Sequence, residues 1–269
     1  MANITNKLKR MFKSTFNKEE IKEAFSVFRI KNEFFDDNNV KENVRIYRHE
    51  FKFLLDPVEF LRCHEMCKRF MPFDENADEN GTYTVTSLYF DSIKSQDYFD
   101  KEMNSFDRKK IRLRTYNRTD RFANLEMKRK VDIYEYKEKL KLSCEQSKRL
   151  IDADYDVLFE LGDETALNFY TKMKENTYRP IMTVEYDRIA FALPFEDIRF
   201  TFDTKIRYNP SNFDIFSDQV FTPALPDGYV VFEMKYNHIL PAWAKKMMNS
   251  MSKSSEPVSK YMIAREFYL

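Results

Sequence analysis

The sequence predicts an α+β protein built on a closed, eight-stranded antiparallel β-barrel with flanking helices. Charged residues recur at every second position in six separate segments, and apolar residues fill the positions between them. Side chains two residues apart in a strand lie on the same face, so each segment reads as a strand with one apolar and one mostly basic face. Helical segments interrupt these strands without regular strand–helix alternation, which favours an antiparallel barrel over βαβ units.

The charged faces of the six segments are dominated by lysine and arginine, with few glutamates. An ordinary antiparallel sheet with its charged face toward water would explain any one of them. All six together indicate a surface selected for an anion. Their charged positions are Glu50 and Lys52; Arg112 and Arg114; Glu126, Lys128 and Lys130; Lys137, Lys139 and Lys141; Arg199, Asp203, Lys205 and Arg207; and Glu233 and Lys235.

The elements can be assigned in order along the chain. A strand over 44–55 leads into a helix that extends to about residue 70, because Asp56 suits the N-cap, Pro57 the first turn and Glu59 the third helical position. Further strands are expected over 82–91, 109–116, 123–131, 133–142, 181–192, 197–208 and 228–236, and helical segments over about 92–102, 143–162, 164–176 and 238–253.

The composition predicts two regions, an N-terminal helical extension over 1–43 and a main domain over 44–269. Residues 18–28 form an amphipathic pattern, so we expect this helix to dock onto the main domain or onto a membrane-protein partner. Binding of the basic segment 7–13 to a membrane surface is the second interpretation. The sequence has no apolar run of 18 residues and no leader-like start, and its three cysteines form no disulfide framework, so a cytoplasmic location is expected.

Several classes of site are excluded by composition. The chain has only three glycines, none close to another, whereas phosphate loops of the nucleotide-binding folds need clustered glycines. Its net charge of +1, from 45 basic and 44 acidic residues, argues against a nucleic-acid-binding surface. Cys63, His64 and Cys67 have no second cysteine or histidine cluster to complete a zinc site, so we expect the cysteines to pack under a helix, with His64 at the surface.

A closed barrel would direct the basic faces inward. Buried like charges repel one another, so such an interior needs anionic oxygens as counter-charges. Arginine and lysine suit phosphates, and basic groups on several strands suit a chain of phosphates. Glu50, Glu126 and Glu233 would then either hold a divalent cation or form ion pairs with neighbouring lysines.

A set of short motifs in fixed order resembles the VTC-type polyphosphate polymerase domains of the triphosphate tunnel metalloenzyme superfamily, which includes the CYTH proteins. The resemblance covers about residues 44–265. Its motifs are Arg48-His-Glu50-Phe-Lys52, Ser87-Leu-Tyr89-Phe90-Asp91, Arg112-Leu-Arg114, Glu126-Met-Lys128, Val184-Glu-Tyr186-Asp-Arg188, Arg199-Phe-Thr-Phe-Asp203, Glu233-Met-Lys235 and Ser259-Lys260-Tyr261.

This resemblance implies a triphosphate tunnel in which ATP donates its γ-phosphate to inorganic polyphosphate, with Mn²⁺ or Mg²⁺ as cofactor and no nucleic-acid partner. It implies Glu233 as the metal ligand, and Arg112, Arg114, Lys128 and Arg199 as catalytic residues. The implied phosphate-binding residues are Lys52, Arg112, Arg114, Lys128, Lys139, Arg188, Arg199 and Lys260, with Lys137 or Lys141 as substitutes for Lys139.

The chain also departs from the family pattern. Met182 and Thr183 stand where a further basic residue is expected, and residues 1–43 are too short for the inositol-phosphate-sensing domain of the fungal proteins. A metal-dependent triphosphatase, with water as the nucleophile, and a non-catalytic polyphosphate sensor or scaffold therefore remain open.

Overall fold

The computed structural model describes residues 49–118, 121–132, 134–193, 197–237, 239–251 and 258–266. By its internal contacts the chain divides into Met1–Ile46 and Tyr47–Leu269, and all described residues belong to the second unit. The expected N-terminal helix, the basic segment 7–13 and the first residues of the strand over 44–55 lie outside the described residues.

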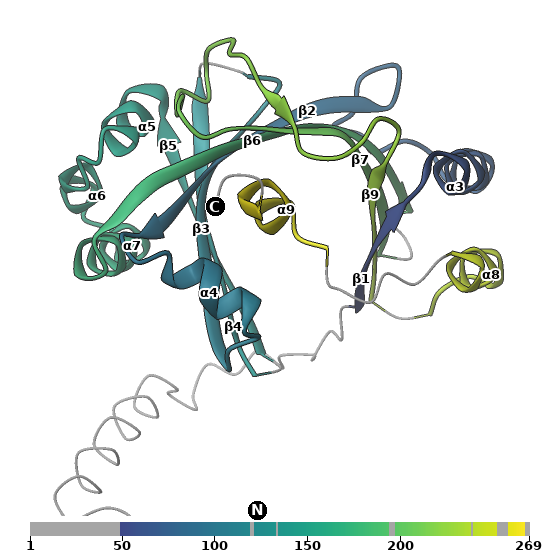
Figure 1. Cartoon of the computed structure of the whole chain (residues 1–269), viewed down its shortest axis with the longest axis horizontal. Coiled ribbons are helices and arrows are strands. Elements are labelled where there is room, and N and C mark those ends of the chain that lie inside the picture. Colours follow the sequence, from purple (N-terminus) through teal and green to yellow (C-terminus); the bar gives the residue numbers. More distant parts are fainter. Residues whose placement is uncertain are drawn as a thin grey trace, which may run out of the picture. The chain divides into compact units, whose positions relative to one another are not determined.

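One strongly curved antiparallel sheet forms the frame of the second unit (Figure 1). Its strands follow the order β1-β9-β7-β6-β2-β3-β4-β5, and the short β8 pairs with β7. The strands are β1 (His49–Leu55), β2 (Thr82–Ser92), β3 (Asp107–Tyr116), β4 (Phe122–Val131), β5 (Tyr134–Ser143), β6 (Tyr178–Leu193), β7 (Ile198–Asn209), β8 (Thr222–Pro223) and β9 (Val230–Tyr236).

The prediction of an antiparallel sheet with flanking helices is confirmed, but the closed barrel is wrong. Within the described chain, β1 and β5 are the two edges of the sheet and do not pair with each other. The helix α9 (Lys260–Glu266), which we did not predict, lies inside the curve of the sheet (Figure 1). Its Tyr261 stacks on Tyr89 with the ring centroids 4.8 Å apart, so the concave face is partly filled by a helix.

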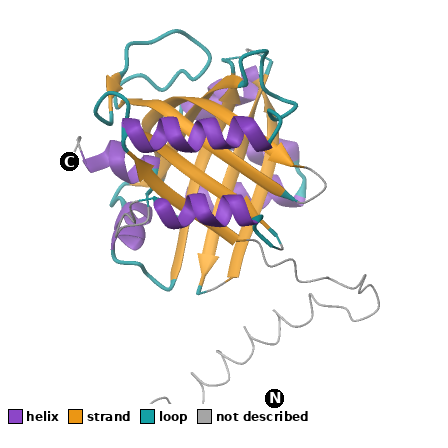
Figure 2. Cartoon of the chain, turned by 90° about the vertical axis from the view of Figure 1, so that its right-hand side faces the viewer, coloured by secondary structure: helices purple, strands orange, loops and turns teal. Residues whose placement is uncertain are grey.

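Two groups of helices cover the convex face. The helices α3 (Pro57–Phe70) and α8 (Ala242–Ser250) cross the strands on one side of the sheet (Figure 2). Beneath them, Phe200, Phe202 and Phe232 are fully buried. Elsewhere on the convex face, α5 (Cys144–Ile151), α6 (Asp156–Leu161) and α7 (Glu164–Glu175) enclose a second apolar core with Leu113 and Phe169. The short helix α4 (Gln96–Glu102) follows β2.

The start of α3 agrees with its capping signals, but two of the predicted helices differ in length from the observed ones. The Asp56 carboxylate accepts hydrogen bonds from the amides of Val58 and Glu59, both at 2.8 Å, at the predicted start of α3. The predicted helix over 143–162 is instead two helices, because Ala153 adopts a left-handed conformation with φ 63°. The predicted helix over 238–253 is shortened to α8, which begins only after Pro241.

Cys63 and Cys67 belong to α3 and are buried on its inner face, where apolar packing was expected. His64 packs against the rings of Phe60, Phe191 and Phe202 rather than lying free at the surface. None of the helices in the described ranges is long and apolar enough to cross a membrane.

Candidate functional site

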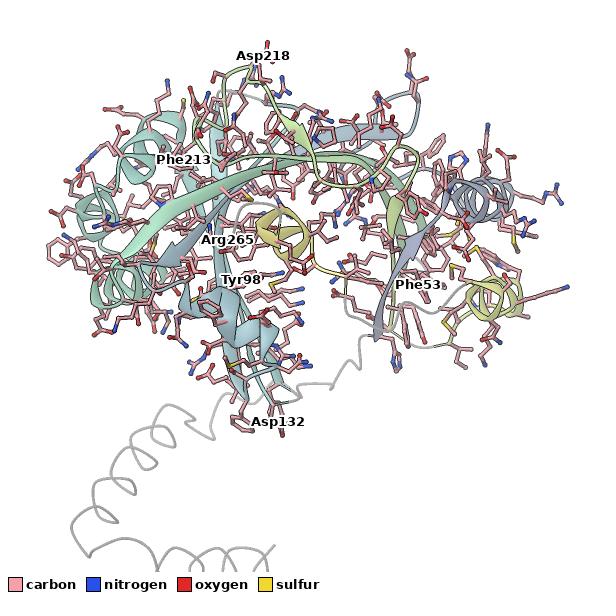
Figure 3. All side chains as sticks on the ribbon, viewed as in Figure 1. Phe53, Tyr98, Asp132, Phe213, Asp218 and Arg265 are labelled. Atoms are coloured by element: carbon pink, nitrogen blue, oxygen red, sulfur yellow. The ribbon has the colours of Figure 1, made fainter. Side chains whose placement is uncertain are left out.

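Strand pairing brings the predicted basic faces together on the concave side of the sheet. Residues directly opposite one another in an antiparallel pair point to the same face. Figure 3 labels Arg265 on α9, inside this curve, and Phe53 on β1, near one edge of the sheet. The opposing pairs are Glu50 with Lys235, Lys52 with Glu233, Arg199 with Lys235, Arg188 with Asp203, Arg112 with Glu126, Glu126 with Lys139, and Lys128 with Lys137.

Two carboxylates and two ammonium groups alternate at the β1–β9 end of this face. The Lys52 ammonium lies 3.2 Å from Glu233 and is also hydrogen-bonded to Glu50. Lys235 pairs with Glu233 and lies 3.9 Å from Glu50. Burial raises the pKa of Glu233, but Lys235 and Lys52 outweigh burial and hold it well below its usual range. Glu233 is therefore ionised at neutral pH.

The two ends of the sheet come within side-chain reach of each other. The Lys128 ammonium on β4 lies 3.7 Å from the Glu50 carboxylate on β1, and 2.6 Å from Glu135 on β5. Burial and Glu233 raise the pKa of Glu50, but Lys52, Lys235 and Lys128 together lower it to about 2. Side-chain charges thus bridge the gap that the backbone of the open sheet leaves.

The two arginines of β3 share one carboxylate. Arg112 binds Glu126 through two nitrogens at 2.8 and 2.7 Å, and Arg114 lies 3.8 Å from the same group. Arg114 also donates to the Ser87 hydroxyl at 3.0 Å and to the Tyr186 hydroxyl at 3.3 Å. These contacts fix both guanidinium groups, and guanidinium nitrogens remain that these bonds do not use.

The helix α9 contributes its first residue to the same face. The Arg188 guanidinium binds the fully buried Asp203 with two hydrogen bonds of 2.6 and 2.9 Å. The Lys260 ammonium lies 2.5 Å from the same carboxylate and 4.9 Å from the centre of the Tyr186 ring. Lys260, predicted from a motif outside the strands, thus lies beside Arg188.

Two predicted residues lie less centrally. Arg199 donates to Asp74 at 2.9 Å and to the Tyr83 hydroxyl at 2.8 Å. Lys139, with Lys137 and Lys141, is exposed on the edge strand β5 and lies on the same face as Glu126. The register of β5 puts all three lysines on this face, so each stays a candidate.

Some residues of the face were not predicted. Glu135 supplies a carboxylate, and Lys110 lies directly opposite Lys128. Asp203 was expected on the charged face but not as a site residue, and its carboxylate binds Arg188 and Lys260. The alternation that selected Arg112 and Arg114 continues back to Lys110, so this lysine could have been found by extending the pattern two residues. The position of Met182, where a basic residue was expected, is fully buried opposite Tyr89.

The acidic residues of the face suit a cation that arrives with its phosphates. In the described part of the chain, no group of three or more His, Cys, Asp or Glu side chains could hold a metal ion by itself. Mg²⁺, however, is commonly bound by one or two carboxylates together with substrate phosphates. Glu233 and the neighbouring Glu50 are such a pair, and both are kept ionised by lysines.

Comparison with known proteins identifies a family. The family model of the VTC domain matches residues 47–269. No curated protein matches the chain. One similar solved structure is a Bacillus halodurans protein described as an adenylate cyclase, with 11% identity, a TM-score of 0.44, and coverage of 77% of this chain and 92% of that one.

Another similar structure is a Hippeastrum protein described as an adenylyl cyclase with a dominant triphosphatase activity. It has 10% identity and a TM-score of 0.49, and the match covers 82% of this chain and 95% of that one. The family match, which spans most of the chain including every strand and helix described above, shows that this protein belongs to the VTC domain family.

Proposed function

We propose that this protein is a polyphosphate polymerase-like phosphotransferase, which transfers the γ-phosphate of ATP to phosphate or polyphosphate bound on its concave face. The convergence of cations from separate elements is the observation that supports this proposal most. Lys52 comes from β1, Arg112 and Arg114 from β3, Lys128 from β4, Arg188 from β6 and Lys260 from α9. Such an arrangement suits one extended polyanion with several phosphates.

In this proposal the protein acts by positioning and by charge stabilisation. Arg112, Arg114, Lys128 and Arg199 would bind the phosphate oxygens on which negative charge develops, as in other phosphoryl transfers. The ion pairs with Glu126 and Glu50 hold Arg112, Arg114 and Lys128 in position before the substrate arrives. No general base is needed, because a phosphate oxyanion is already a nucleophile.

Glu233, with Glu50 beside it, would hold a divalent cation such as Mn²⁺ or Mg²⁺. When bound, this cation would neutralise charge on the phosphate oxygens. Lys139 and its neighbours on β5 would contact the distal part of a longer chain. We retain as proposals the division into an N-terminal helical extension over 1–43 and a VTC-like triphosphate tunnel domain over 44–269, and the docking of that extension onto a membrane-protein partner.

Product analysis tests this function directly. The protein is incubated with ATP and Mn²⁺, and the products are separated by gel and by ³¹P NMR. Long polyphosphate chains are expected, and their yield should fall at least a hundredfold in Arg112→Ala. Lys205→Ala is the matched control, because Lys205 is exposed and lies outside the cluster of ion pairs on the concave face. Free phosphate without chains would instead establish a triphosphatase, and no turnover a non-catalytic binder.

A further inference from the structure

Lys110 differs from the other basic residues at the centre of the concave face. It lies on β3, two residues before Arg112 and directly opposite Lys128 on β4. Among the described residues, no carboxylate lies within ion-pair distance of its ammonium nitrogen, and no hydrogen-bond partner is found. Within the described ranges, no ion-pair partner therefore balances its charge.

The four cations that act on Lys110 most strongly come from three strands and one helix. They are Arg112 on β3, Lys52 on β1, Lys128 on β4 and Lys260 on α9. Each of these lies within ion-pair distance of at least one carboxylate, some of them shared: Glu126 for Arg112, Glu50 and Glu233 for Lys52, Glu135 and Glu50 for Lys128, and Asp203 for Lys260.

Two further acidic groups near this end of β3 are also occupied, and one of them, Asp97, lies 3.3 Å from the Lys109 ammonium. The Asp91 carboxylate on β2 accepts hydrogen bonds from the amides of Ser92, Asp97 and Tyr98 and from the Tyr261 hydroxyl. Burial, followed by Arg112, Lys52, Lys128 and Lys260, lowers the pKa of Lys110 well below its usual range.

We propose that Lys110 couples polyphosphate binding to proton uptake: its ammonium group loses its proton at lower pH while the concave face is empty than when it is occupied, so that over this pH range the side chain takes up one proton from solvent when a phosphate chain enters. This inference rests on the proposed function, because it needs a polyanion as the ligand. The amine and the proton combine into an ammonium ion, and no bond of the phosphate chain is broken.

The coupling has a definite direction. A bound polyanion supplies the negative charge that Lys110 lacks and so raises its pKa. Between the pKa of the empty site and that of the occupied site, binding takes up a proton, and affinity rises as the pH falls. Below both values Lys110 is charged in both states, and the coupling disappears.

The protonation of the empty site is tested first, without any phosphate. Acetic anhydride acetylates neutral amines: the nitrogen attacks the carbonyl carbon, acetate leaves and a proton is released. The rate of Lys110 acetylation is followed by mass spectrometry from pH 6 to 11, with N-acetyl-lysine amide in the same tube as the reference amine. We expect the half-maximal rate of Lys110 at a lower pH than that of the reference. An equal or higher midpoint overturns the proposal, whether or not the site binds phosphate.

Proton uptake is then measured by titration calorimetry with tripolyphosphate in two buffers of different ionisation enthalpy, over the same pH range. Lys110→Arg keeps a positive charge but cannot lose it, and Lys205→Arg, at an exposed lysine outside the cluster of ion pairs on the concave face, is the matched control. We expect the unchanged protein and Lys205→Arg to take up about one proton more than Lys110→Arg at the pH of maximal coupling. Equal uptake by all three overturns the proposal.

The two failures can be told apart. If tripolyphosphate binds to none of the three proteins, the proposed function fails and the coupling fails with it. If tripolyphosphate binds but uptake does not depend on Lys110, only the coupling fails.

Discussion

At the scale of single residues, carboxylates solve the problem of burying many positive charges in one place. We expected such a site to need anionic oxygens from a ligand. The structure supplies them from the protein, with Glu126 beside two arginines and Asp203 beside Arg188 and Lys260. Partly buried ion pairs of this kind are costly to break by removing one partner. They also preorganise the cations for a polyanion.

Glu233 is the residue whose role is most open to a direct test. Its contacts with Lys52 and Lys235 suit an ion pair, and its ionised state suits a metal ligand. If it holds the cation, Glu233→Gln keeps the fold and most of the triphosphate affinity, and lowers turnover by about a hundredfold or more. Turnover is measured across a Mn²⁺ titration, together with thermal unfolding.

The matched control is Glu135→Gln, which removes a carboxylate paired with Lys128 and Lys137 but not assigned to the metal. It should leave the Mn²⁺ dependence unchanged. A loss of about 3–5 kcal/mol of stability in Glu233→Gln, with near-normal turnover, would make it a structural ion pair. The cation would then belong to Glu50 or Glu126.

At the scale of elements, α4 contains a buried carboxyl group that makes the stability of the folded protein depend on pH. Asp97, in the first turn, accepts a hydrogen bond of 2.6 Å from the Tyr178 hydroxyl, and its carboxylate lies 3.3 Å from the Lys109 ammonium. Burial raises its pKa to about 6, although Lys109 and Tyr178 favour the ionised form. Protonation of Asp97 therefore stabilises the folded protein.

The sign follows from the two pKa values. The folded value of about 6 lies above the unfolded value of about 3.9, so Asp97 makes folding more favourable as the pH falls between them. Asp97→Asn removes this dependence. The free energy of unfolding of Asp97→Asn, taken relative to that of the unchanged protein, should fall by on the order of 2 kcal/mol from pH 7 to pH 4.5, because only the unchanged protein gains stability from protonation at this position.

Urea unfolding of both proteins at a series of pH values measures this difference. Other carboxylates titrate equally in both proteins, so their effects cancel in the comparison. A difference in unfolding free energy that stays constant with pH would contradict the assignment.

At the scale of the whole molecule, the sequence patterns predicted which side chains lie on each face of the sheet, but not whether the sheet closes into a barrel. Alternation along β3 and β4 correctly separated Leu113 and Met127, which are buried, from the charged residues of the opposite face. Alternation contains no information on whether the edge strands β1 and β5 meet through backbone hydrogen bonds. That outcome depends on the coiling of the whole sheet and on α9, which packs inside it.

For the candidate site, too, the sequence predicted the residues on each strand but not the partners that hold them in place. Each strand contributed residues that its own two-residue period identifies, such as Lys52 and Arg112. The partners that fix their positions come from distant segments, as Asp74 does for Arg199 and Glu50 for Lys128. No local pattern links such pairs. Lys260 was found only because a motif resembled the family, since the pattern of its helix was not recognised.

The central claim is that the concave face binds a chain of phosphates, and thermal unfolding with tripolyphosphate tests it most directly. Bound ligand stabilises only the folded state, so a concentration of one hundred times the dissociation constant should add about 2.7 kcal/mol. The melting temperature of the unchanged protein should rise accordingly, and most of that rise should disappear when Arg112→Ala and Arg114→Ala are combined. A melting temperature that does not change at millimolar tripolyphosphate, or an equal rise in the double variant, would contradict the claim.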